Sequence, residues 1–232
     1  QALCADYRVV CPDFPGRGES EWLKNPVDYN MPLYLADMLT LIARLDVEKL
    51  DWLGTSMGGL VGMVLASLPD NPIGKLVLND AGPLVTAVSL DRIGEYVGQA
   101  PVLPSMAAAE MLVRAVSAPF GPHSDAEWRF LTEHVVRTRE EGGVVFRYDP
   151  AIAVAFNADR PHKDIELWPV YDAIRCPTLV LRGAESDLLT AQTALEMARR
   201  GPKAACVEFS GVGHAPTLIH HDQIAVVRKF LL

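Results

Sequence analysis

The sequence lacks a hydrophobic run long enough to cross a membrane. Its most apolar stretch, Leu60 to Leu68, is far shorter than the roughly 20 residues that a spanning helix needs. No signal peptide is visible at the start of the chain, which begins at Gln1 rather than Met. We therefore expect a cytoplasmic protein with no membrane partner.

Cysteine is scarce as well. The chain has four cysteines and no C-x-x-C pair. Three of them lie in or beside apolar, strand-like runs, where a thiol behaves as a small hydrophobic group. We expect reduced thiols rather than disulfides or a metal site at Cys4, Cys11, Cys176 and Cys206.

Charged residues make up only 22% of the chain, and no long run of one sign occurs. With 21 Lys and Arg against 29 Asp and Glu, the formal net charge is -8. Nucleic acids and anionic membranes repel an acidic surface, so neither is an expected partner. The expected partner is a small-molecule substrate, and the oligomeric state stays open.

What the sequence does contain is an alternation of short apolar runs with helix-like segments across 232 residues. Such alternation predicts a mostly parallel sheet with helices on both faces. The runs that read as strands are Tyr7–Cys11, Leu50–Leu53, Lys75–Asn79, Thr178–Leu181 and Cys206–Phe209. The helical segments are a helix capped by Asn30 with Pro32 in its first turn, then Met57–Leu68, Thr190–Arg200 and Ile219–Leu232.

The stretch 83–171 interrupts this alternation. It has helical patterns and no strong strand run, so we interpret it as a helical cap inserted into a core made of 1–82 and 172–232. Ser124 with Glu127 matches a capping box, which predicts a helix from there to about Gly142.

The segment Gly54-Thr55-Ser56-Met57-Gly58-Gly59 stands between a strand-like run and a helix-like run. Its glycines let the backbone turn sharply, which forces the serine into a strained conformation and exposes its hydroxyl. A serine hydroxyl is a weak nucleophile, so it needs a base and a group that orients the base.

Two later segments supply such groups, each just after a strand-like run: Gly183-Ala184-Glu185-Ser186-Asp187 and Gly211-Val212-Gly213-His214. The order Ser, Asp, His in these contexts resembles the α/β-hydrolase superfamily over nearly the whole chain. The resemblance implies the α/β-hydrolase fold, a mostly parallel twisted sheet flanked by helices with a helical cap insertion.

The same resemblance implies a catalytic triad. Ser56 would be the nucleophile, His214 the general base and then acid, and Asp187 the residue that orients His214. Asp80 follows the preceding strand and is the second candidate for the acid, because some relatives place it there. The main-chain N–H of Met57 would be one oxyanion donor, and the second donor and the first strands of the fold are expected upstream of Gln1.

Further residues have weaker signals. The segment Asp13–Ser20 resembles the superfamily's D-x-P-G-x-G-x-S loop and is expected beside the site. Trp128 and Phe130 either line the substrate cleft or dock the insertion on the core. His220 and His221 near His214 could suggest a metal site, but no carboxylate spacing supports one, so we expect neither metal nor cofactor.

The expected function is hydrolysis of a small ester or lactone by a serine esterase through an acyl-enzyme. Two alternatives stay open: a carbon–carbon bond hydrolase of aromatic catabolism, and a non-catalytic ligand-binding protein of the same fold.

Overall fold

The computed structural model describes residues 1–158 and 163–232; residues 159–162 fall within the stretch 83–171. Its centre is a four-stranded sheet of order β1-β2-β7-β8, in which every pair of neighbours is parallel. The predicted parallel sheet is thus confirmed. Its strands are β1 (Leu50–Thr55), β2 (Ile73–Asn79), β7 (Thr178–Gly183) and β8 (Ala205–Phe209).

The register of this sheet brings the ends of its strands together. Thr55 at the end of β1 pairs with Asn79 at the end of β2, which in turn pairs with Leu181 in β7. The next residue along the chain, Ser56, donates its main-chain N–H to the Asn79 carbonyl at 3.0 Å. Side chains that follow these strands therefore gather at the carboxyl edge of the sheet, where open parallel sheets bind their ligands.

Helices cover both faces of the sheet, and the two-residue period of the strands decides which residues meet them. Leu76 and Leu78 belong to a core cluster that also contains residues of helices on one face of the sheet, whereas Val77 between them packs with a helix on the opposite face. The first group is α1 (Met31–Leu45), α2 (Met57–Ser67), α7 (Trp168–Ala173) and α8 (Ala191–Met197), and the opposite helix is α9 (His221–Leu231).

Side-chain caps begin two of these helices, and the one at Asn30 was predicted. The Asn30 side chain accepts a hydrogen bond from Leu33 N at 3.1 Å at the start of α1, and a 3-10 turn, η1 (Pro26–Asp28), precedes it. Thr190 caps α8 in the same way through Thr193 N. These side chains satisfy main-chain donors that the first turn of a helix leaves free.

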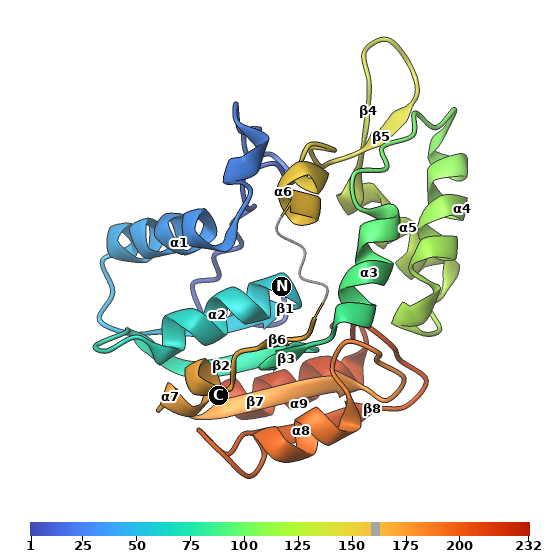
Figure 1. Ribbon diagram of the computed structural model, residues 1–232. Coiled ribbons are helices and arrows are strands. Elements are labelled where there is room, and N and C mark those ends of the chain that lie inside the picture. Colours follow the sequence, from blue (N-terminus) through green and yellow to red (C-terminus); the bar gives the residue numbers. More distant parts are fainter. Residues whose placement is uncertain (159–162) are drawn as a thin grey trace.

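The segment between β2 and β7 contains most of the remaining elements. Figure 1 shows α3, α4 and α5 grouped together, away from α1 and α2. The elements are β3 (Leu84–Val85), α3 (Ala87–Tyr96), α4 (Met106–Val116), η2 (Ala118–Phe120), α5 (Asp125–Val135), β4 (Val136–Thr138), β5 (Val144–Phe146), α6 (Ile152–Ala158) and β6 (Ile165–Glu166).

The predicted helix from Ser124 to about Gly142 is right at its start and wrong at its end. Both halves of the capping box form, but α5 ends at Val135 and the chain continues into a β4–β5 hairpin. β-Branched residues favour strands, and Gly142 and Gly143 provide two positive φ angles in the turn. The segment also contains an antiparallel β3–β6 pair, so it is less purely helical than predicted.

The prediction of a buried strand at Tyr7–Cys11 is wrong. These residues form no strand, and Val9 and Val10 are 43% and 42% exposed. In the described part of the chain, no strand pairs with them. The four cysteines are free, but Cys4, Cys11 and Cys206 are exposed rather than packed as small hydrophobic groups.

Among the described residues, no helix combines the length and apolar character that a membrane crossing requires.

Candidate active site

Ser56 occupies a sharp turn between β1 and α2. Its φ of 51° and ψ of -117° lie outside the conformations that residues with side chains prefer. Glycine makes the turn possible: a Cβ at Gly54 would lie 2.1 Å from the Gly58 carbonyl oxygen, and one at Gly59 would lie 2.5 Å from the Ala81 Cβ. The sharp strand-to-helix turn predicted from the motif is therefore present in the backbone.

The side chains of Ser56, His214 and Asp80 form a continuous hydrogen-bonded chain. His214 Nε2 lies 2.9 Å from Ser56 Oγ, and His214 Nδ1 lies 2.6 Å from Asp80 Oδ2. An ionised carboxylate can only accept, so Nδ1 carries the proton and Nε2 is left to accept from the serine hydroxyl. The arrangement can withdraw a proton from Ser56 and stabilise the imidazolium that results.

Asp80 is fully buried, and its carboxylate has three partners. Besides His214, Oδ1 accepts from the main-chain N–H of Gly183 at 3.0 Å, and Oδ2 accepts from the Ser186 hydroxyl. Ser186 Oγ is itself held by main-chain N–H groups of Leu188 and Leu189. Burial of a charged group is costly unless it is hydrogen-bonded, and these donors meet that requirement.

The prediction that Asp187 accompanies His214 needs correction. Asp187 instead pairs with Arg92, at 2.7 Å from Nε and 3.0 Å from Nη2, and its side chain is 54% exposed. Ser186, one residue earlier, is the one that turns inward and binds Asp80. The structure therefore has Asp80, the second candidate from the sequence, in the place expected of Asp187.

The loop that carries His214 is held from several sides by residues that the motifs did not indicate. Asn79 donates from Nδ2 to the Pro216 carbonyl at 2.8 Å and to Thr55 Oγ1 at 2.9 Å. The Gly213 N–H donates to the Pro119 carbonyl at 2.6 Å. Asn79 could have been noticed as a polar residue ending a buried apolar strand, but the role of Pro119 has no sequence signal.

The α4–α5 connection contributes a second contact to the same loop. His123 Nε2 lies 2.9 Å from Thr217 Oγ1, and the His123 ring packs beside those of Trp128 and His220 with centroids 4.9 and 4.7 Å away. Glu127 Oε1 lies 3.6 Å from His220 Nε2. Hydrogen bonds from Ser124, with a smaller contribution from His220, lower the pKa of Glu127.

Trp128 and Phe130, predicted either to line a cleft or to dock the insertion, have different surroundings. Trp128 is buried against His123 at the junction with the His214 loop, in a packing position. Phe130 is 49% exposed, and its ring stacks on His134 of the same helix.

His220 and His221 do not assemble with His214 into a metal site. Within the described residues, no group of three or more His, Cys, Asp or Glu side chains is arranged to hold a metal ion. His214 is engaged by Ser56 and Asp80, and His220 faces Glu127.

The main-chain N–H of Met57 opens α2 directly after Ser56. The first N–H groups of a helix have no intrahelical acceptor, and the helix dipole makes that end favourable for negative charge. The loop Asp13–Ser20, expected beside the site, contacts the side chain of the same residue, because Arg17 Nη2 lies 3.7 Å from Met57 Sδ.

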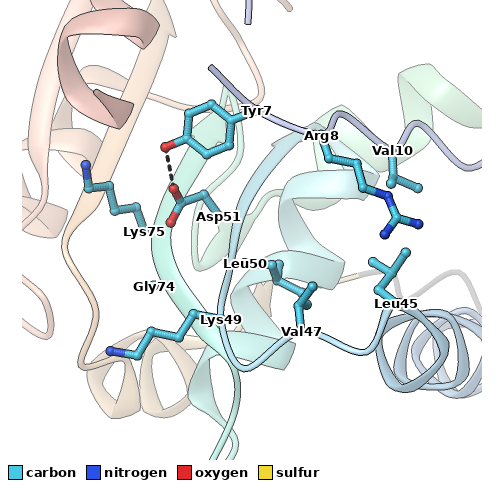
Figure 2. A pocket seen from close by; sticks show the side chains of 10 residues that line it. All are labelled: Tyr7, Arg8, Val10, Leu45, Val47, Lys49, Leu50, Asp51, Gly74 and Lys75. Carbon is cyan, nitrogen blue, oxygen red and sulfur yellow. Dashed lines mark hydrogen bonds between the residues drawn. The ribbon is translucent and has the colours of Figure 1, made fainter. Parts of the chain in front are cut away.

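A groove of about 400 Å³ lies away from this site, at the start of β1. In Figure 2, Tyr7 points toward Asp51, and their hydrogen bond measures 2.7 Å. That bond and burial raise the pKa of Tyr7 to about 12. Asp51 precedes Ser56 by five residues of extended chain, or about 17 Å, so the groove is not part of the hydrogen-bonded chain.

Comparison with known proteins agrees with this geometry. A family model described as "Alpha/beta hydrolase family" matches residues 1–228. A 3-hydroxybutyrate-oligomer hydrolase from Cupriavidus necator is 45% identical over 99% of this chain and 80% of its own length.

Two solved structures are also similar. An alpha/beta hydrolase from Novosphingobium aromaticivorans is 37% identical with a TM-score of 0.88, over 97% of this chain and 80% of that one. A Rickettsia typhi protein is 35% identical with a TM-score of 0.91, over 99% and 78%. The fold, the sharp turn at Ser56 and the sequence similarity lead to one assignment: the chain is a member of the alpha/beta hydrolase family.

Proposed function

We propose that this protein is a serine esterase that cleaves small carboxylic esters through an acyl-enzyme. The observation that supports this most directly is the hydrogen-bonded chain from Asp80 through His214 to Ser56 at the strained turn. A nucleophile, a base and an orienting acid in contact are the groups that acyl transfer requires.

In the first half-reaction, Ser56 Oγ attacks the ester carbonyl while His214 Nε2 takes the hydroxyl proton. The tetrahedral oxyanion is stabilised by the Met57 N–H, and Asp80 stabilises the imidazolium. The carbon–oxygen bond to the alcohol then breaks, and His214 returns the proton to the leaving oxygen. In the second half-reaction, water takes the place of Ser56 as nucleophile and releases the acid.

The substrate class that one relative favours is esters of short hydroxy acids. The Cupriavidus necator relative is named for hydrolysis of 3-hydroxybutyrate oligomers, which are such esters. In the proposed enzyme the stretch 83–171 acts as a cap over the site, since its α4–α5 connection contacts the loop of His214 through Pro119 and His123. Lactones contain the same reacting group and belong to the same proposal.

An active-site probe tests the nucleophile. We expect a fluorophosphonate to label the full chain, and Ser56→Ala to lose both the label and the turnover of 4-nitrophenyl butyrate. Ser67→Ala, at the other end of α2, is the matched control and should keep both. Labelling that persists in Ser56→Ala, or a wild-type protein that turns over no ester, would contradict the proposal.

A further inference from the structure

Arg17 brings a positive charge to the turn that carries Ser56. Its side chain is half-buried, and Nη2 lies 3.7 Å from the sulfur of Met57, the residue after Ser56. Nη1 lies 3.2 Å from the Tyr34 hydroxyl and 3.3 Å from the Pro15 carbonyl oxygen. The guanidinium carbon is 5.4 Å from the centre of the Tyr34 ring. Each of these partners is uncharged.

In the part of the chain that the structure describes, no carboxylate forms an ion pair with Arg17. Acidic side chains from its own loop and from the residues after β5 are bound elsewhere. Asp13 accepts from Glu19 N at 3.0 Å, and Asp149 accepts from the Tyr29 hydroxyl at 2.6 Å and from Ala151 N at 2.9 Å. A half-buried charge without a counter-ion is unfavourable. The chain has a net charge of -8 and thus an excess of carboxylates, yet none of those described pairs with Arg17.

The hydrogen bonds of Arg17 leave one edge of the guanidinium available. A guanidinium has five N–H donors, and the two on Nη1 face Tyr34 and Pro15. Nη2 makes one weak contact with sulfur, and within the described residues Nε donates to no acceptor. The Nε–Nη2 edge is the one that can hold both oxygens of a carboxylate.

We propose that Arg17 binds a carboxylate of the substrate, so that the preferred esters carry a free carboxylate a few bonds from the ester group. This inference rests on the proposed esterase function. The oxyanion donor and the side chain that Arg17 contacts belong to one residue, Met57. Carbonyl and carboxylate would thus be separated by about the reach of one methionine side chain. Esters of 3-hydroxy acids meet this requirement, because three bonds join the ester oxygen to the carboxylate carbon.

Two substrates that differ only in charge test the proposal: 3-(butanoyloxy)butanoate and its neutral primary amide, both followed by butyrate release. We expect the wild-type protein to prefer the carboxylate. In Arg17→Gln, kcat/KM for the carboxylate should fall by about 10- to 100-fold, as expected for loss of charge-assisted hydrogen bonds. This decrease should come mainly from a higher KM. For the amide, kcat/KM of Arg17→Gln should stay within about twofold of the wild-type value.

Arg139→Gln is the matched control, because it removes the same charge from the β4–β5 hairpin, where Arg139 pairs with Glu141. It should leave the preference unchanged. Equal losses on both substrates in Arg17→Gln, or no loss on either, would overturn the proposal. Failure of the esterase function would look different, since the wild type would then release butyrate from neither substrate.

Discussion

At the scale of single residues, the structure shows Asp80 rather than Asp187 in contact with His214. Asp80 and Asp187 both follow strands of one parallel sheet, so strand order alone brings both to the same edge. What separates them is the direction of the side chains. Ser186 and Gly183 donate to a buried Asp80, while Asp187 lies outside with Arg92. Which of the two side chains turns inward has no periodic signature, so the sequence alone placed Asp187 rather than Asp80 beside His214.

We predict that Asp80→Asn lowers kcat for 4-nitrophenyl butyrate by about 10³- to 10⁴-fold, because an amide in this place favours the wrong imidazole tautomer. Asp187→Asn is the matched control and should keep kcat within about twofold, since it removes only an exposed ion pair with Arg92. Both are measured by steady-state kinetics. A large loss in Asp187→Asn with little change in Asp80→Asn would restore Asp187 as the acid.

Other residues of the site were visible in the sequence because their chemistry depends on local pattern. Ser56 sits in a glycine turn that only a strand-to-helix reversal explains, and His214 follows Gly211 and Gly213. The contacts of Pro119 and His123 could not be foreseen, because they join segments about 94 residues apart through one main-chain and one side-chain hydrogen bond.

At the scale of elements, the connection between α4 and α5 holds the His214 loop on both sides of the histidine. Pro119 binds Gly213, the residue before it, and His123 binds Thr217, three residues after it. We therefore expect a displacement of this connection to shift His214, the base of the proposed mechanism. Misplacement of a catalytic group by about 1 Å can reduce the rate by about 100-fold.

We expect His123→Ala to lower kcat about 10-fold with little change in KM, because the loop loses one anchor while the substrate contacts remain. His134→Ala on the exposed side of α5 is the control and should behave as the wild type. Steady-state kinetics together with melting temperatures separate this effect from general destabilisation. If KM rises while kcat is constant, His123 acts on substrate binding instead.

The elements that were predicted correctly are those whose signal is local. The strands β1, β2, β7 and β8 follow from apolar runs, and the caps of α1 and α5 follow from capping residues. The wrongly predicted strand is an apolar run that lacks a neighbouring strand in the part of the chain that the structure describes. Tyr7–Cys11 has the composition of a strand, but hydrogen bonds to a neighbour make a strand, and none forms in the described residues.

At the scale of the whole molecule, the alternation of strands and helices was enough to predict a parallel sheet with two covered faces. It was not enough to say how the chain start joins that sheet. Tyr7 makes this link: its hydroxyl lies 2.7 Å from Asp51 Oδ2 in β1 and 2.8 Å from the Leu231 carbonyl oxygen in α9. Three distant parts of the chain thus meet at one phenol.

We predict that Tyr7→Phe lowers the free energy of unfolding at pH 8 by about 1 kcal/mol, the usual contribution of a hydrogen bond. The bond to Asp51 and burial raise the pKa of Tyr7 from 10.0 to about 12. Because the folded-state pKa exceeds the unfolded one, this stabilisation is complete below pH 10 and is lost as the pH rises from 10 to 12.

The difference between wild type and Tyr7→Phe should therefore shrink across that interval. Urea denaturation at pH 8, 10 and 11 measures it, and Tyr96→Phe, at an exposed position, is the control. A difference that is constant with pH would show that the Tyr7 hydroxyl does not titrate as stated.

The pairing of Thr55 with Asn79 has a consequence for how such an enzyme can change over time. Ser56 and Asp80 each follow directly after one member of this pair. The pairing of the two strands therefore keeps the spacing between these two residues. The segment after Asp80 can then be lengthened, shortened or exchanged without a change in that spacing, provided that it still makes hydrogen bonds to the loop of His214. In the proposed enzyme, selectivity could therefore change through this segment while the groups that carry out the reaction keep their places.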